Sequence, residues 1–211
     1  MSEAIGYAQL AAMVRAAAEE VRAHVPLLTK LDSVGGDGDH GITMARAMGL
    51  AEKAIEAEGT GQINALLTDV GWGIMGVDGG ATGPLLGTLF MGMSDSVGDA
   101  DALDTSGLAA ALVAGLAALE KQTPARPGDK TLMDALVPAV TAVRDAADAG
   151  KSPAEALADA AEAAAKGAEA TQKLQARFGR AKSIKEASIG SQDPGATSMS
   201  LLFRGFADAC Q

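Results

Sequence analysis

Three aspartates lie close together in a glycine-rich stretch near the N-terminus, Leu31-Asp-Ser-Val-Gly-Gly-Asp-Gly-Asp-His-Gly41. Hard cations such as Mg²⁺ prefer oxygen ligands, usually one or two carboxylates together with the phosphates of a substrate. Glycines let the backbone fold tightly, so Asp32, Asp37 and Asp39 can converge on one point. We interpret them as metal ligands. The alternative, a turn with Asp39 as a helix N-cap, would suffice for an isolated Asp-Gly-Asp.

Three further segments combine glycine with hydroxyl or charged residues before a predicted helix. They are residues 79–84 (Gly-Gly-Ala-Thr-Gly-Pro), residues 127–131 (Pro-Gly-Asp-Lys-Thr) and the basic stretch 175–197. Exposed N–H groups at a helix N-terminus attract anions, and the guanidinium of an arginine suits a phosphate. Each segment alone also fits an ordinary turn with a helix cap. No Gly-Lys-Ser/Thr follows the first one, so it is not a P-loop.

The spacing of apolar residues predicts eight helices, and no alternating pattern is long enough to predict a strand. Few aromatic residues (3%) and abundant alanine agree with this interpretation. We expect Pro26 to stop the first helix, and a polar loop to follow from Thr29 to His40. Ser152 and Glu155 should form a capping box, and Asp193 should cap the last helix. The predicted helices cover residues 2–24, 41–59, 62–75, 84–97, 105–123, 130–149, 152–176 and 194 onward, with Ser2 as the first N-cap.

The four segments precede the second, fourth, sixth and eighth predicted helices. In an up-and-down bundle, alternate junctions lie at the same end. The sequence therefore predicts one all-α domain, residues 1–211, folded as an eight-helix antiparallel barrel or bundle with one Mg-nucleotide site at one rim. A plain helical protein whose acidic loops are only caps is the alternative, and it would show no Mg-dependent nucleotide binding.

The bulk composition limits the partners of the chain. Its net charge of −10 argues against nucleic acid and against anionic membranes, which both require basic surface. No apolar stretch is long enough to span a membrane, and the acidic N-terminus, with Glu3, does not resemble a signal peptide. Cys210 is the one cysteine, so no disulfide within the chain is expected. We expect a cytoplasmic protein.

In order and spacing, these segments resemble the L subunit or L domain of dihydroxyacetone kinases, the DhaL-type family. The matching blocks are residues 31–41 with Met44, 79–87, 127–131, 175–180 and 188–197. The resemblance implies an eight-helix barrel, a single DhaL-type domain over residues 1–211, with the nucleotide at one end. It also implies that Asp32, Asp37 and Asp39 hold two Mg²⁺ ions on the phosphates.

The resemblance also implies which residues contact ADP or ATP. Thr43 stands where family members often carry asparagine, and Thr123 where a glycine is common, whereas the three aspartates are present. With these aspartates, Arg180 is the fourth expected catalytic residue. The expected nucleotide contacts are His40, Gly41, Ile42, Thr43, Ala81, Thr82, Thr123, Leu132, Arg180, Asp193, Pro194 and Gly195.

The implied activity is in-line transfer of a phosphoryl group from Mg-bound nucleotide to dihydroxyacetone, or a related small ketose such as erythrulose, held by a separate K subunit. Either ADP stays bound and is rephosphorylated by a phosphohistidine-bearing phosphotransferase-system subunit, or ATP exchanges in each turnover. We favour the first, because an L subunit stands alone here. A function of another class is a Mg-ADP-binding regulatory module that acts on a transcription factor.

Overall fold

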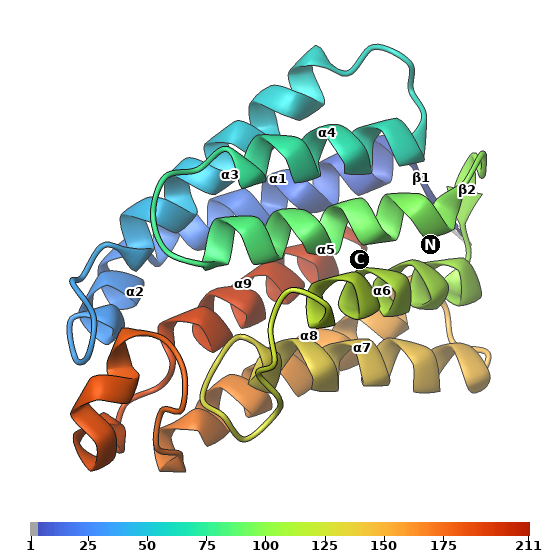
Figure 1. Cartoon of the computed structure of the whole chain (residues 1–211). Coiled ribbons are helices and arrows are strands. Elements are labelled where there is room, and N and C mark those ends of the chain that lie inside the picture. The colour runs from blue at the N-terminus through green and yellow to red at the C-terminus, as the bar shows by residue number, and fades with distance from the viewer. Residues whose placement is uncertain (1–3) are drawn as a thin grey trace.

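The Ala- and Leu-rich stretches form nine α-helices within residues 4–211, the part of the chain that the computed structural model describes (Figure 1). The predicted N-cap Ser2 lies outside the described residues. Two 3₁₀ helices, η1 (Thr171–Lys173) and η2 (Arg180–Ser188), follow α8. The α-helices are α1 (Tyr7–Ala23), α2 (Val25–Asp32), α3 (His40–Ala57), α4 (Ile63–Met75), α5 (Thr82–Val97), α6 (Thr105–Glu120), α7 (Met133–Asp148), α8 (Pro153–Ala170) and α9 (Pro194–Ala209).

The short helix α2 corrects the expectation that Pro26 ends helical structure and that a loop begins at Thr29. Helix α1 ends at Ala23, and Pro26 lies in the first turn of α2. The first turn of a helix tolerates proline because its N–H groups have no partner within the helix. As a consequence, Asp32 is the last residue of a helix rather than part of a loop.

A second difference is a two-residue antiparallel strand pair. Strand β1 (Ile5–Gly6) pairs with β2 (Ala102–Leu103), with Ile5 opposite Leu103. A strand of two residues is too short to show an alternating pattern, so the sequence could not predict it. The pair fastens the start of α1 to the connection between α5 and α6.

The eight long helices form a closed ring in the order α1, α3, α4, α5, α6, α7, α8 and α9, and α9 packs against α1 (Figure 1). The predicted eight-helix barrel is therefore confirmed, with α2 as an addition at one end. Gly205 allows the ring to close, because a methyl group at this position would collide with the backbone of Ala17. Buried side chains such as Met13, Leu66 and Phe203 fill the core.

The junctions that precede α3, α5, α7 and α9 lie at one end of the barrel, on the left in Figure 1. The strand pair and the α3–α4, α5–α6 and α7–α8 connections lie at the opposite end. None of the helices within residues 4–211 combines the length and the apolar character that a membrane crossing requires. The alternation of a closed antiparallel ring thus places the four sequence motifs on one rim.

Candidate functional site

A cavity of about 520 Å³ opens at this rim, and all four junctions contribute to its wall. Its polar part includes side chains of the acidic loop, the α4–α5 turn and the start of α9. Its apolar part comes from residues beside the glycine motifs. The apolar residues of the wall include Leu31, Val34, Leu85, Leu132, Met133, Phe178 and Ile184.

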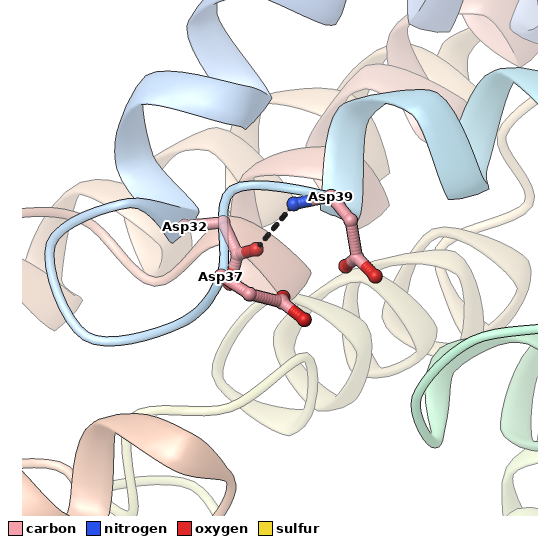
Figure 2. A group of neighbouring side chains, drawn as sticks. All are labelled: Asp32, Asp37 and Asp39. Atoms are coloured by element: carbon pink, nitrogen blue, oxygen red, sulfur yellow. Dashed lines mark hydrogen bonds between the residues drawn. The ribbon is translucent and has the colours of Figure 1, made fainter.

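The three aspartates converge beside this cavity (Figure 2). Asp32 ends α2, Asp37 lies in the loop, and Asp39 directly precedes α3. One carboxylate oxygen from each lies within 4.8 Å of those from the other two. Figure 2 shows the side chains of Asp37 and Asp39 extending to the same side of the loop. Three hard oxygen donors at this separation fit a divalent cation such as Mg²⁺.

Asp32 also fixes the start of α3. Its Oδ2 accepts hydrogen bonds from the backbone N–H groups of Asp39 at 3.0 Å and His40 at 3.3 Å. The loop can turn this tightly because Gly36 has no side chain, since a Cβ there would collide with the Asp32 carboxylate. Asp39 itself makes no capping hydrogen bond with its side chain, so its carboxylate is not used as a helix cap.

Arg180 reaches the acidic loop from η2 and forms an ion pair with Asp37. Both side chains are about half exposed to solvent. One guanidinium offsets only one of the three carboxylate charges, and like charges this close repel each other unless a cation lies between them. The charge balance thus agrees with the donor set in favouring a bound cation.

His40 begins α3 and is buried in the cavity wall, with 8% of its surface exposed. Burial lowers the pKa of its imidazole, and the nearby Asp32 offsets part of this effect. Ser198 on α9 donates its hydroxyl proton to the carbonyl of Gly195 at 3.0 Å. The Nε2 of His40 lies within hydrogen-bonding distance of that hydroxyl oxygen, at 3.1 Å. His40 thereby links α3 to α9.

The N-terminus of α9 is capped as predicted. Asp193 accepts a hydrogen bond from the N–H of Ala196 at 2.7 Å, and Pro194 occupies the first turn. Although Asp193 borders the cavity, its carboxyl group is surrounded by protein atoms. This burial raises its pKa to about 7; the Ala196 N–H opposes the shift, and repulsion from Asp134 adds to it. Asp193 is therefore an unusually basic carboxylate at the cavity edge.

Most of the residues that sequence reasoning selected lie in the cavity wall. Three of the selected residues do not. Asp37 belongs to the acidic cluster instead, Gly41 packs against the backbone of α2 at Val25, and Ile42 is 48% exposed. The role of Gly41 and Ile42 in nucleotide contact stays a prediction, as does the metal-binding role of Asp37. The selected residues in the wall are Asp32, Asp39, His40, Thr43, Ala81, Thr82, Thr123, Leu132, Arg180, Asp193, Pro194 and Gly195.

Sequence reasoning did not select Lys130, which also lines the cavity. The residue belongs to the segment 127–131, which is one of the four junctions expected to form the site, but no role was expected for its lysine. Lys130 is 4% exposed and has a left-handed backbone with φ of 61°. Residue type gives no signal of either property. The charge of a lysine inside a glycine-rich turn was the one indication that the sequence offered.

Several known proteins are similar to this chain in sequence. A family model described as DAK2 domain matches residues 34–208. PEP-dependent dihydroxyacetone kinase 1, ADP-binding subunit DhaL, of Listeria innocua is 37% identical over 187 residues, which make up 88% of this chain and 87% of that protein. The D-erythrulose kinase of Mycolicibacterium smegmatis is 34% identical over 184 residues, 86% of this chain but 32% of that protein.

A solved structure shares the fold. The dihydroxyacetone kinase from C. freundii, in complex with AMP-PNP and Mg²⁺, superposes with a TM-score of 0.75 and 26% sequence identity. The match covers 95% of this chain and 34% of that chain. The present chain thus spans about a third of the length of that kinase, and a similar share of the erythrulose kinase.

Proposed function

The chain belongs to the DAK2-domain family, and we propose that it is the nucleotide-binding phosphotransfer subunit of a dihydroxyacetone-type kinase. The observation that supports this best is the convergence of Asp32, Asp37 and Asp39 beside a cavity whose wall contains both polar and apolar residues. Such a cavity suits a ligand that has a charged phosphate end and a flat aromatic base. The relatives named as ADP-binding support the same ligand.

Asp32, Asp37 and Asp39 would hold the Mg²⁺, two ions by family resemblance. When bound, the metal neutralises the charge of the transferred phosphoryl group and of its leaving group. Asp32 has a second task, because its hydrogen bonds to the start of α3 keep the loop in the shape that brings the carboxylates together. The metal site and the N-terminus of α3 are therefore built as one unit.

The remaining residues of the site bind and orient the nucleotide. Arg180 supplies a guanidinium beside the acidic cluster, where it can bind a phosphate as its charge develops in the transition state. The turn before α5, with Ala81 and Thr82, offers backbone N–H groups at a helix N-terminus for an anion. Apolar residues such as Leu132 and Phe178 would cover the base and exclude water.

The acceptor, dihydroxyacetone or a related small ketose, would be held by a separate K-type subunit. The Listeria relative supports this arrangement, because it is named as an ADP-binding subunit and the match covers 87% of its length. For the donor we favour bound ADP that a phosphohistidine-bearing subunit recharges, since the Listeria relative is named PEP-dependent. Exchange of ATP in each turnover is the alternative. A kinase of this type would act in the cytoplasm.

The test uses the purified protein alone. It is denatured, any released nucleotide is identified, and the exchange of that nucleotide with added Mg-ATP is timed. Tightly held ADP that exchanges slowly is the expected result and supports recharging by a phosphoprotein. Rapid exchange would favour ATP as the donor. Absence of any Mg-dependent nucleotide affinity would overturn the proposed function.

A further inference from the structure

The stretch between α8 and α9, which we call the 171–193 loop, returns to its starting point. Near its base, the N–H of Asp193 donates to Thr171 Oγ1 at 2.8 Å, and the N–H of Gly190 donates to the carbonyl of Gln172 at 2.8 Å. These hydrogen bonds hold the two ends of the loop side by side. A contact that holds this base in place therefore also restricts the position of the residues within the loop, including Arg180.

Lys130, from the junction before α7, reaches the base of this loop. Its Nζ donates hydrogen bonds to the carbonyl of Thr171, at 2.7 Å, and to the carbonyl of Ser191. One acceptor belongs to the outgoing end of the loop and the other to the returning end. A single ammonium group therefore connects both ends, and charge-assisted hydrogen bonds of this kind are stronger than neutral ones.

The junction that carries Lys130 is itself held rigidly. The carboxylate of Asp134 accepts hydrogen bonds from the N–H groups of Gly128 at 2.6 Å and Thr131 at 2.8 Å. Next to Lys130, the carbonyl of Asp129 accepts from the N–H of Arg177 at 3.1 Å, and the two side chains form an ion pair. The junction thus contacts the 171–193 loop both at its base and at Arg177, in the segment that leads away from α8.

Lysine is an unusual residue for this position. A φ of 61° lies in the left-handed region, which glycine adopts more readily than residues with a side chain. Burial lowers the pKa of the Lys130 ammonium, while Asp193 and Asp134 counteract this effect. A buried cation without partners is strongly unfavourable, so the hydrogen bonds of Lys130 to the two carbonyls, together with the negative charge of the nearby Asp193 and Asp134, stabilise it there. Both features indicate that the position depends on the ammonium group.

We propose that Lys130 is a positioning residue of the phosphotransfer site. Its ammonium group clamps the two ends of the 171–193 loop and thereby holds Arg180, which the loop carries, beside the acidic cluster. The clamp follows from the contacts alone. Its effect on phosphoryl transfer rests on the proposed function, so the two are tested separately.

The clamp is tested by limited trypsin digestion of Lys130→Met and Lys130→Arg, with Lys166→Met, an exposed lysine of α8 outside the loop, as the matched control. Trypsin cleaves after Lys173, Arg177, Arg180, Lys182 and Lys185 in the loop, and after Arg46 and Lys53 on α3. In Lys130→Met, cleavage within the loop should be at least about tenfold faster than in the wild type, with cleavage in α3 unchanged.

Lys130→Arg should restore most of the protection of the loop, and Lys166→Met should show the wild-type rate of cleavage in the loop. Equal loop cleavage in Lys130→Met and the wild type would overturn the clamp. Faster cleavage at all positions alike would also overturn it, because that result means a general loss of stability.

The positioning role is tested with Mg-ADP and with phosphoryl transfer to dihydroxyacetone in the presence of the K-type partner. Lys130→Met should lower kcat about tenfold and change the Mg-ADP affinity less than about threefold. A parallel loss of affinity and kcat would mean that Lys130 binds the nucleotide directly, which contradicts the proposal. If the wild type binds no nucleotide, the proposed function fails, while the trypsin result still decides the clamp.

Discussion

The two ends of the barrel use the same residue types in different ways. At the end away from the cavity, two capping aspartate and serine side chains bond within their own turn. Asp104 accepts from the N–H three residues ahead at 2.7 Å, and Ser152 and Glu155 form a reciprocal capping box. At the cavity end, charged side chains also bond to other junctions. This difference separates an end that only closes the fold from an end that builds a site.

Two contacts at the cavity end illustrate the point. Arg180 crosses to the acidic loop, and Lys130 crosses to the 171–193 loop, whereas Asp32 connects the two ends of its own junction. A side chain with a partner in its own turn needs no other part of the chain. A side chain that bonds across junctions fixes their relative positions, and a site made of several junctions requires this. The following predictions test the contrast, beginning with the largest expected effect.

Asp39→Asn should reduce Mg-dependent ADP affinity roughly 100-fold, because it removes the charge of a metal-binding carboxylate. Asp99→Asn makes the same change on an exposed residue at the opposite end and should alter the affinity less than about twofold. Calorimetric titration with ADP, with and without Mg²⁺, measures both. Equal affinities in the two variants would sink the metal assignment.

Arg180→Ala should slow phosphoryl transfer roughly 100-fold, because it removes a guanidinium aimed at developing charge. The exposed Arg144 on α7, which pairs only with its neighbour Asp145, provides the control Arg144→Ala. Both variants should keep their melting temperature within about 2 °C, since exposed ion pairs stabilise little. A large drop in the melting temperature of Arg180→Ala alone would instead indicate a structural role.

Asp193→Asn should remove a dependence of stability on pH. The pKa of Asp193 is raised from 3.8 to about 7 on folding, so between about pH 4 and 7 the folded protein binds a proton that the unfolded chain has released. The free energy of unfolding should therefore fall as pH rises through this window. Asparagine keeps a capping oxygen but cannot ionise, so the variant should lose this slope.

Urea unfolding at pH 5 and pH 8 measures the effect. Asp104→Asn is the matched control, since Asp104 is also an aspartate N-cap, on α6 at the opposite end. A pH slope of Asp193→Asn that equals the slope of the wild type would contradict the assignment of the buried proton to Asp193.

Ser152→Ala is the smallest change and belongs to the end without a cavity. It removes the hydroxyl of the capping box and should cost about 1 kcal/mol, which lowers the melting temperature by roughly 2–4 °C. Differential scanning calorimetry measures this shift, and the Mg-ADP affinity should not change. A loss of affinity here would show that the two ends are coupled, and the contrast drawn above would not hold.

Local patterns in the sequence predicted most of the fold. The spacing of apolar residues within each helix, and caps such as Ser152 and Asp193, need no knowledge of the tertiary structure. Pro26 misled the prediction because proline at a first turn and proline after a last turn look alike in one sequence. The strand pair was not predicted for a different reason. Each strand has only two residues, and Ile5 pairs with Leu103, about a hundred residues away in the sequence.

The site was predictable to the extent that its chemistry is local. Three aspartates among glycines are visible in a short stretch, and the alternation of helices places the four junctions together. The contacts of Lys130 join it to Thr171 and Ser191, which are distant in the sequence. Its burial and left-handed backbone follow from those contacts. The same holds for the cavity wall at Phe178, whose neighbours are set by tertiary packing.

The closure of the ring by α1 and α9 has a consequence for synthesis. Helix α1 packs against α9, which begins only at residue 194, so the ring stays open until almost the whole chain has left the ribosome. Contacts between such distant segments form late. Until α9 has formed, the apolar faces of α1 and α8 that it covers remain exposed to solvent. The turn at Asp193 also completes the cavity. A nucleotide therefore stabilises only the finished barrel, and its binding would distinguish complete chains from truncated ones.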